Sequence, residues 1–233
     1  MELKKINSEQ INQLYLFTRQ HFVEYYDLQT ELVDHLANAI EEQWQTNPKR
    51  TFDEALQIEF KKFGVFGFME VVEKRQVALQ KKYGKIVWNH FKNFFRLPQI
   101  IGTFSAVGIL FLILRESAYS KVLFLSIATL LLLSFFFEIF RNAKNYKRRS
   151  EETGKKWLFK EIINSYGYGM GFIYLPFQII FQFREHLNND IVLAVASFGI
   201  VSIALSQYIV LVLIPKKTEQ YLKETYPEYE FSK

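Results

Sequence analysis

The sequence predicts an all-α membrane protein in which a small N-terminal cytoplasmic helical domain is followed by four transmembrane helices. Apolar residues in the first part of the chain recur at helical spacing among many charges, whereas residues 98–214 contain long apolar runs with almost no charge. Lys and Arg gather in alternate connections between those runs. Cysteine is absent, which excludes disulfides, thiolate zinc sites and cysteine nucleophiles.

The N-terminal domain is expected to cover residues 1–95. Its apolar periodicity predicts four helices, at about 8–26, 27–45, 52–63 and 66–95. Ser8 is the expected N-cap of the first helix. Thr51 and Glu54 form a capping box that opens the third, and Gly64 is expected to end it in the left-handed conformation. The fourth helix is expected to lead into the first membrane span.

The apolar runs define a membrane domain over residues 96–215 and a cytoplasmic tail over residues 216–233. Each run is close to the ~20 residues that cross a ~30 Å hydrocarbon core. The expected spans are about 97–114, 120–140, 162–183 and 191–214. The run at 162–183 is rich in Gly and dotted with Gln, and it either spans the membrane or is re-entrant.

The distribution of Lys and Arg predicts the orientation of these spans. The segment before the first run holds 14 Lys and Arg, and the successive connections and the tail hold 2, 8, 1 and 4. Because cytoplasmic loops carry the excess of Lys and Arg, both termini and the 141–160 loop are expected in the cytoplasm. The net charge of +5 therefore reflects topology and does not favour nucleic acid as a partner.

The N-terminal helices resemble the HAAS-type (helix-turn-helix-associated alpha-helical signalling) domain. Two segments carry the resemblance, LVDHLANAIEEQ and TFDEALQIEFKKFG, with the matching residues Leu32, His35, Leu36, Ile40, Glu41, Glu42, Asp53, Glu54, Ala55, Phe63 and Gly64. The usual glycine of the break is replaced by Asn47-Pro48. The resemblance covers residues 10–75. It implies a small signalling or interaction module without catalysis, which a multi-span membrane module often follows. We expect the protein to be integral to the bacterial cytoplasmic (inner) membrane.

Several residues invite a chemical interpretation that the sequence does not favour. His35 shares a helix face with Glu31, but no H-E-x-x-H pattern is present, so we expect His35 to bond a neighbouring carboxylate or helix end. The glycines of residues 167–171 resemble a potassium-channel filter but lie on the cytoplasmic side. Close helix packing is favoured for them and for two similar faces, which gives the pairs Gly167 and Gly171, Gly102 and Ala106, and Ser202 and Ser206.

Polar residues of the spans are expected to have structural roles. Glu138 is expected to pair with Arg141 at the cytoplasmic edge, and Gln178, Gln182 and Gln207 are expected to form hydrogen bonds between helices. The basic stretch 144–160, which includes Trp157, serves as a topology signal or attracts anionic lipid.

No nucleophile, paired base, phosphate loop or metal cluster emerges, so we predict no enzyme activity, no cofactor and no metal. The expected function is signalling or regulation, in which the cytoplasmic helical domain binds a protein partner. The alternative is an accessory or structural subunit of a larger membrane transport or secretion complex, and a small channel or transporter is less favoured. Membrane lipid is an expected partner, as is a protein in the membrane or cytosol, which includes homo- or hetero-oligomers.

Overall fold

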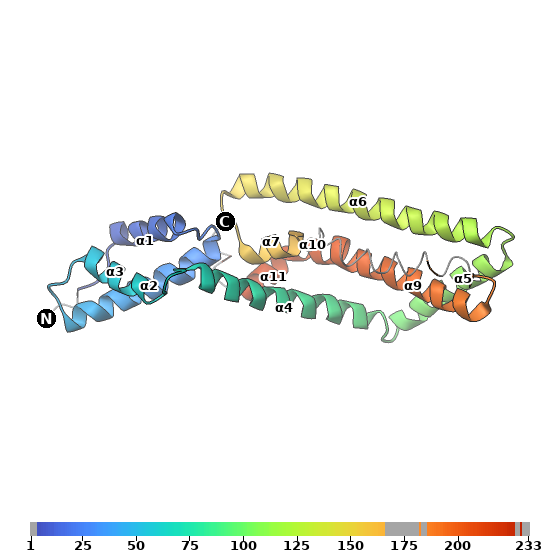
Figure 1. The fold of residues 1–233 in the computed structure, drawn as a ribbon, viewed down its shortest axis with the longest axis horizontal. Coiled ribbons are helices and arrows are strands. Elements are labelled where there is room, and N and C mark those ends of the chain that lie inside the picture. Colours follow the sequence, from blue (N-terminus) through green and yellow to red (C-terminus); the bar gives the residue numbers. More distant parts are fainter. Residues whose placement is uncertain (1–3, 166–181, 183–185, 227–228, 230–233) are drawn as a thin grey trace. The chain divides into compact units, whose positions relative to one another are not determined.

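A computed structural model describes residues 4–165, 182, 186–226 and 229, with the backbone alone for residues 149–153 (Figure 1). All the regular structure in this part of the chain is helical. In chain order the helices are α1 (Ser8–Gln20), α2 (Tyr26–Thr46), α3 (Phe52–Lys61), α4 (Met69–Asn93), α5 (Gln99–Glu116), α6 (Ser120–Thr153), α7 (Leu158–Ser165), α9 (Asp190–Tyr208), the π-helical turn η3 (Ile209–Leu213), α10 (Ile214–Lys216) and α11 (Thr218–Thr225).

The chain forms two compact units. The first, called the N-terminal domain below, comprises Met1–Lys81 and Thr153–Glu161. The second, called the membrane domain, comprises Lys82–Glu152 and Ile162–Lys233. The predicted N-terminal domain covered residues 1–95. In the structure, residues 82–95 belong to the second unit, and residues 153–161 belong to the first although they lie between two segments of the second.

The ends of α1 differ from the prediction. Its N-cap is Asn7, not Ser8: the Asn7 side chain accepts a hydrogen bond from the Gln10 amide at 2.8 Å, and the Asn7 amide donates one to Gln10 Oε1 at 3.0 Å. The helix also ends at Gln20 rather than near residue 26. Phe22 follows with a φ of +65°, a left-handed conformation that a bulky residue rarely adopts. No Gly or Pro marks this turn, so periodicity alone could not find it.

One face of α2 forms the centre of the N-terminal domain's core. Leu32, Leu36, Ile40 and Trp44 recur at helical spacing and are each at most 3% exposed. They pack with residues of α1 and α3, such as Leu14 and Ala55, which are fully buried. Burial of this extent means that truncating Leu36 to Ala would cost about 2–5 kcal/mol.

The predicted start of α3 is confirmed, and the helix ends at Lys61, two residues before the predicted Phe63. Thr51 and Glu54 form both hydrogen bonds of the capping box, at 3.1 and 3.3 Å. Gly64 has a φ of +74°, as a left-handed helix end requires. Gly67 follows with a φ of +53°, and a Cβ there would lie 3.0 Å from the Phe60 ring. These two glycines make the turn into α4, which begins at Met69 and not at residue 66.

Three helices of the described chain are long and apolar enough to cross a membrane. They occupy Gln99–Glu116, Ser120–Arg148 and Asp190–Lys216, which coincide with the predicted first, second and fourth spans. The protein is therefore assigned to a membrane. Most of the predicted third span, 162–183, lies outside the described residues, so the four-span count stays a prediction.

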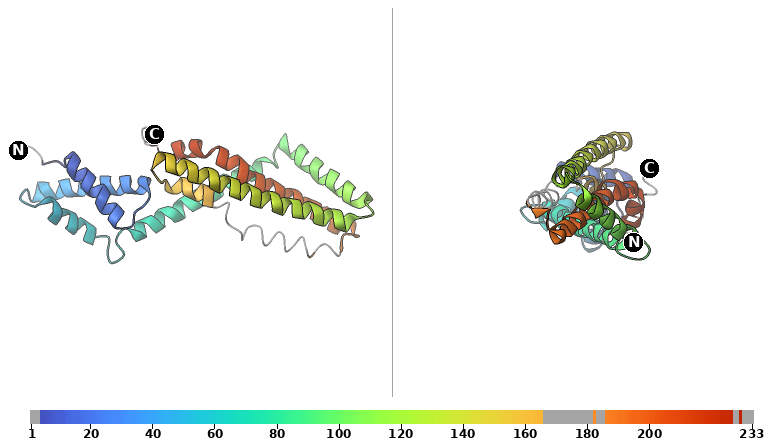
Figure 2. Two further views of the ribbon diagram at one scale, coloured as in Figure 1. Left: turned by 90° about the horizontal axis from the view of Figure 1, so that it is seen from above. Right: turned by 90° about the vertical axis from the view of Figure 1, so that its right-hand side faces the viewer.

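The helices α5, α6 and α9 enclose the core of the membrane domain (Figure 2). Its buried residues are Leu114, Phe124, Ala128, Leu187, Leu193, Ala196 and Ile200. Further along α6 and α9, Ser134 of α6 accepts a hydrogen bond from Gln207 of α9. Because contacts advance along both helices together, α6 and α9 run parallel, as the views of Figures 1 and 2 also show.

Two segments predicted as a loop and a tail are helical. The basic residues after the second span continue α6 without a break to Thr153, so that the helix is 34 residues long. The tail forms α11, whose buried Tyr221 and Leu222 pack within the membrane domain. Tyr221 Oη lies 2.7 Å from Nε2 of His90, and the Lys82 ammonium donates to Thr225 Oγ1 at 2.8 Å, so α11 covers one face of the second half of α4.

Candidate functional site

The most distinctive site of the N-terminal domain lies where the segment 154–161 meets the start of α2. We call this segment the strap. The Tyr26 amide donates to the Lys156 carbonyl oxygen at 2.7 Å, and the Leu158 amide donates to Asp27 Oδ1 at 3.1 Å. Tyr26 is the first residue of α2 and Leu158 the first of α7. Each helix start is thus capped by the other segment.

Local physical chemistry explains this reciprocal capping. The first amides of a helix have no partner within the helix, and α2 has Tyr25 at its N-cap, which makes no side-chain capping bond. Asp27 and Leu158 are buried, with 4% and 2% exposure, so unbonded polar groups would be costly there. A carboxylate at the N-terminus of α7 is also favoured by the helix dipole.

Aromatic and charged side chains extend the contact. The Tyr26 and Trp157 rings meet edge to face with centroids 5.5 Å apart, and the Lys155 ammonium lies 4.4 Å from the Tyr26 ring centroid. Lys156 pairs with Glu24 at 2.8 Å. That pair is more than half exposed and adds little, so the buried capping bonds and Trp157, which is 3% exposed, dominate the strap's attachment.

The electrostatics of the junction follow from its burial and its acidic side chains. Burial, the negative charge of Glu161 and a hydrogen bond to that carboxylate raise the pKa of Tyr25 to about 12. The hydrogen bond and the positive charge of Lys156 lower the pKa of Glu24, and the same pair raises the pKa of Lys156. At neutral pH Tyr25 is therefore protonated, and Glu24 and Lys156 are both ionised.

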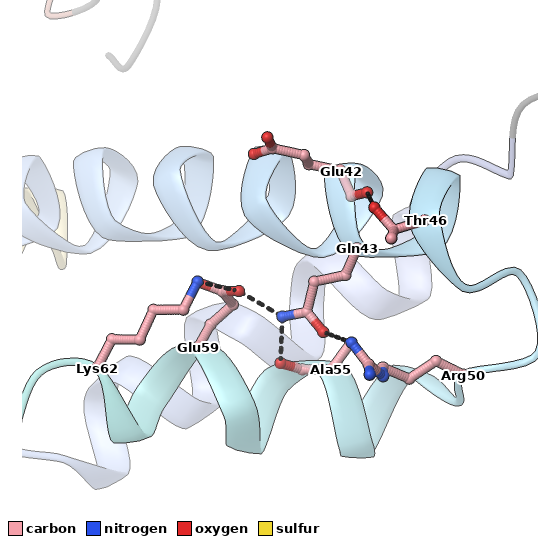
Figure 3. A network of polar contacts seen from close by, with 7 residues as sticks. All are labelled: Glu42, Gln43, Thr46, Arg50, Ala55, Glu59 and Lys62. Carbon is pink, nitrogen blue, oxygen red and sulfur yellow. Dashed lines mark hydrogen bonds and ion pairs between the residues drawn. The ribbon is translucent and has the colours of Figure 1, made fainter.

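A polar network braces the other end of α2 against α3 (Figure 3). The Gln43 amide donates to the Ala55 carbonyl oxygen at 3.3 Å and to the Glu59 carboxylate, and the Arg50 guanidinium donates to Gln43 Oε1 at 2.6 Å. Lys62 pairs with Glu59 at 2.7 Å. Glu59 is 4% exposed, so the network neutralises and bonds a carboxylate that would otherwise be costly to bury.

A third feature is an exposed apolar group next to an aromatic cluster. The rings of Phe17, His21, Phe60, Phe63 and Phe68 pack together, with centroid distances of 4.1–6.1 Å between contacting pairs. Chain neighbours of this cluster are left in solvent: Phe22 is 78% exposed, Val65 98% and Phe66 77%. We call these three residues the apolar tip.

The residues on which the HAAS-type resemblance depends have structural positions. Leu32, Leu36, Ile40 and Ala55 are core residues, Glu54 completes the capping box and Gly64 makes the turn after α3. His35 differs from its expected role, because its exposed ring lies edge to face with Phe63 at 6.1 Å. Glu31 pairs instead with Arg75 at 3.7 Å. Within the described residues, no three His, Asp or Glu side chains are grouped to hold a metal.

Of the three pairs of residues expected to pack helices together, the two that the structure describes differ in their exposure to solvent. Gly102 and Ala106 are exposed on α5, and a Cβ on Gly102 would meet open space. Ser202 and Ser206 are half-buried on α9, and Ser206 donates to the Ser202 carbonyl oxygen at 2.8 Å. Gly167 and Gly171 lie outside the described residues.

Among the polar residues of the spans, two expected contacts are confirmed. Glu138 pairs with Arg141. Gln207 Nε2 donates to Ser134 Oγ at 2.7 Å, which joins α9 to α6. Gln182 is exposed, and Gln178 lies outside the described residues.

Sequence reasoning missed a polar bridge at the end of α9. Pro215 has no amide hydrogen, so the Leu211 carbonyl lacks its ordinary helical donor four residues ahead. Asn142 of α6 supplies one, with its Nδ2 at 2.7 Å from the Leu211 oxygen. The backbone there is π-helical, and the Ile214 amide donates to the Ile209 carbonyl. Pro215 indicates in the sequence that the Leu211 carbonyl lacks a donor. The sequence does not indicate that Asn142, 69 residues before Leu211, supplies one.

Reasoning from the sequence also missed the strap. Trp157, which was expected beside the bilayer, is buried against Tyr26, and Lys155 and Lys156 contact the N-terminal domain. Gly154, with a φ of +61°, gave the available signal, because it separates α6 from a new helix start.

Comparisons with known protein families, with curated proteins and with solved structures find no match for this chain.

Proposed function

We propose that this chain is a non-enzymatic integral membrane protein that acts in signalling or regulation, with its N-terminal helical domain binding a protein partner in the cytoplasm. The strap carries this proposal. It lies in the chain between α6 and α7, yet its contacts make it part of the N-terminal domain. Movement of α6 along or about its axis would therefore pull on the capping bonds at the start of α2.

The structure of α6 supports such coupling. It is one helix from Ser120 to Thr153, so its membrane-spanning part and its last residue belong to the same rigid element. Only Gly154 and the three residues after it separate that helix from Leu158. A short connection transmits displacement better than a long flexible loop.

The proposed topology has four spans, with both termini in the cytoplasm of a bacterium and the membrane domain in its inner membrane. The alternation of Lys and Arg supports the orientation. The parallel course of α6 and α9 supports the predicted third span, 162–183, and hence a total of four, because a chain that joins two parallel membrane helices crosses the membrane once between them. Reporter fusions at residues 118 and 187 should read extracytoplasmic, and fusions at 150 and 220 cytoplasmic. A cytoplasmic signal at 118 or 187 would overturn this topology.

The apolar tip supports the binding of a protein partner by the N-terminal domain. Phe22, Val65 and Phe66 remain exposed after the domain's core has been filled, with Leu16 at 57% and Ile58 at 39% on neighbouring helices. Large exposed apolar groups on a domain with a complete core are typical of interaction surfaces. The HAAS-type resemblance is consistent with this role.

Site-directed crosslinking tests the proposal, because the chain contains no cysteine. A single cysteine at Phe66 or Phe22, labelled with a photoreactive group in intact cells, should yield one defined protein adduct. A cysteine at the exposed Asn38 serves as the matched control and should not. The adduct should weaken when Asp27→Ala releases the strap. Absence of an adduct at both tip positions would refute partner binding there.

The accessory-subunit alternative is favoured by one observation. On α5 the exposed Gly102 and Ala106 leave open space into which a neighbouring helix could pack closely. A photoreactive cysteine at Ala106 distinguishes the two functions. An adduct with a membrane subunit at Ala106, together with none at Phe66, would favour the accessory role.

A further inference from the structure

We propose that the second half of α4 and the turn after it, residues 85–96, form a binding site for anionic phospholipid headgroups. The proposal goes beyond the signalling function and does not depend on it. Six residues make up this surface, three aromatic and three cationic: Trp88, Phe91, Phe95, Lys85, Lys92 and Arg96. We call it the lipid face.

The aromatic part of the lipid face is a continuous ladder. The Trp88 and Phe91 rings stack with an interplanar angle of 15° and centroids 5.9 Å apart, and Phe91 contacts Phe95 at 5.2 Å. Trp88 is nevertheless 58% exposed, so the ladder presents its outer side to the surroundings. Tryptophan prefers the headgroup level of a bilayer, where its ring is in apolar surroundings and its N–H finds polar partners.

The opposite face of the same helix is already occupied. His90 and Lys82 bond Tyr221 and Thr225 of α11, and Tyr83 is 2% exposed. Successive residues turn by about 100° around a helix, so His90 lies about 200° from Trp88. Phe91 and Lys92 lie within about 60° of Trp88 by the same measure. The helix therefore packs on the protein with one face and leaves Trp88, Phe91 and Lys92 on the other. Phe95, at the end of the ladder, also contacts the Phe198 ring of α9, with centroids 6.2 Å apart.

Charge complementarity selects an anionic ligand. Residues 74–115 contain eight Lys and Arg and no Asp or Glu. The Lys92 ammonium lies 5.8 Å from the Trp88 ring centroid, and Lys85 and Arg96 are exposed. Cations near an anionic membrane surface contribute about 1 kcal/mol each. No acidic residue within residues 74–115 therefore neutralises the cations of the lipid face.

The position of the surface in the chain selects lipid among anionic ligands. The Arg96 carbonyl accepts a hydrogen bond from Ile100, in the first turn of α5, at 2.9 Å, so the lipid face continues directly into a membrane-spanning helix. Lys85 and Lys92 are seven residues apart in one helix, a rise of about 10 Å. The headgroup layer is about 5–7 Å deep on each side of the bilayer. Arg96 and Lys92, the cations nearest α5 in the chain, are therefore within reach of the phosphates of lipids around α5, and Lys85 lies about 10 Å further along the helix than Lys92.

The test uses the full chain purified in a neutral detergent. Native mass spectrometry should show retention of phosphatidylglycerol over phosphatidylcholine with the same acyl chains. The variant Lys85→Gln/Lys92→Gln/Arg96→Gln should lose this preference by roughly fivefold for each cation removed. The control Lys5→Gln/Lys49→Gln/Lys61→Gln removes the same charge from exposed positions of the N-terminal domain and should keep the preference.

A second measurement does not depend on the charge variants. Brominated phosphatidylglycerol in nanodiscs should quench tryptophan emission of the full chain more than that of Trp88→Phe, because Trp88 lies at the headgroups. Equal retention of the two lipids, equal loss in both triple variants, or equal quenching with and without Trp88 would each overturn the proposal. Tighter retention of a single-stranded oligonucleotide than of phosphatidylglycerol would replace it with nucleic-acid binding.

Discussion

Replacing Asp27 by Ala should release the strap while leaving the rest of the N-terminal domain folded. The substitution removes the acceptor of the Leu158 amide, which lies 3.1 Å from Asp27 Oδ1 in a buried position. A hydrogen bond to a charged group contributes about 1.5–3 kcal/mol, and an unbonded buried amide costs a similar amount. We therefore expect a local destabilisation of about 2–3 kcal/mol. Asp27→Asn keeps an acceptor but loses the charge, and should cost about 1 kcal/mol.

Hydrogen–deuterium exchange of the purified protein measures this change locally. A cost of about 2 kcal/mol corresponds to roughly 30-fold faster exchange of the amides at 158–161 and 26–29. Amides in the middle of α2, near Leu36, should exchange as before, since their core contacts are untouched. The control Asp53→Ala removes an exposed acid from the first turn of α3. Unchanged exchange at both stretches in Asp27→Ala, or equal effects in Asp53→Ala, would refute the capping argument.

Three further predictions concern polar contacts elsewhere. Asn142→Ala should destabilise the protein in detergent by about 1 kcal/mol, and Pro215→Ala should restore part of it, because residue 215 regains an amide hydrogen for the Leu211 carbonyl. Burial and, second, the charge of Lys217 lower the pKa of His90, so the contact with α11 should be stable above pH 6.5 and weaken as pH falls below it. Since the pKa of Tyr25 is raised to about 12, the strap should detach as pH rises from 10 to 12, as measured by exchange at 158–161.

Each of these predictions has a matched control. Asn145→Ala changes an exposed amide on the same helix as Asn142 and should leave the melting temperature unchanged. His90→Gln should abolish the acid-dependent exchange of residues 218–225, whereas His186→Gln at an exposed position should not. Tyr25→Phe should remove the alkaline transition, and the exposed Tyr119→Phe should preserve it. A Pro215→Ala variant that worsens Asn142→Ala would contradict the missing-donor explanation.

The features predicted correctly depend on interactions close together in the sequence. The capping box at Thr51, the turn at Gly64 and the core stripe from Leu32 to Trp44 are each encoded within a few residues, by hydroxyl, glycine or apolar spacing. The apolar runs are equally local, and three of them are membrane-compatible helices. The turn at Phe22 was missed because its left-handed residue is neither Gly nor Asn.

The site could not be predicted because its partners are far apart in the chain. Asp27 and Leu158 are 131 residues apart, and Asn142 and Leu211 are 69 apart. The neighbouring sequence of each partner already suggests an ordinary role for it, so nothing points to a distant contact. Asp27 is an ordinary acid in a first helical turn, and Lys155-Lys156-Trp157 is an ordinary juxtamembrane basic segment. The sequence shows that a helix start needs a cap, but it does not show which distant segment supplies it.

In the proposed function, the basic loop 141–160 has two roles, and they place different demands on the same residues. As a topology signal, the loop needs only its charges, and Lys155 and Lys156 would serve anywhere within it. As a strap, it needs Lys156 to present its carbonyl to Tyr26 and Trp157 to pack on that ring. A Lys156→Arg change preserves both roles, whereas moving Trp157 by one residue preserves only the first. The variant with Trp157 moved by one residue should insert into the membrane with normal orientation. Its amides at 26–29 should nevertheless lose their protection against hydrogen–deuterium exchange. This result would show that attachment of the strap is not needed for membrane insertion.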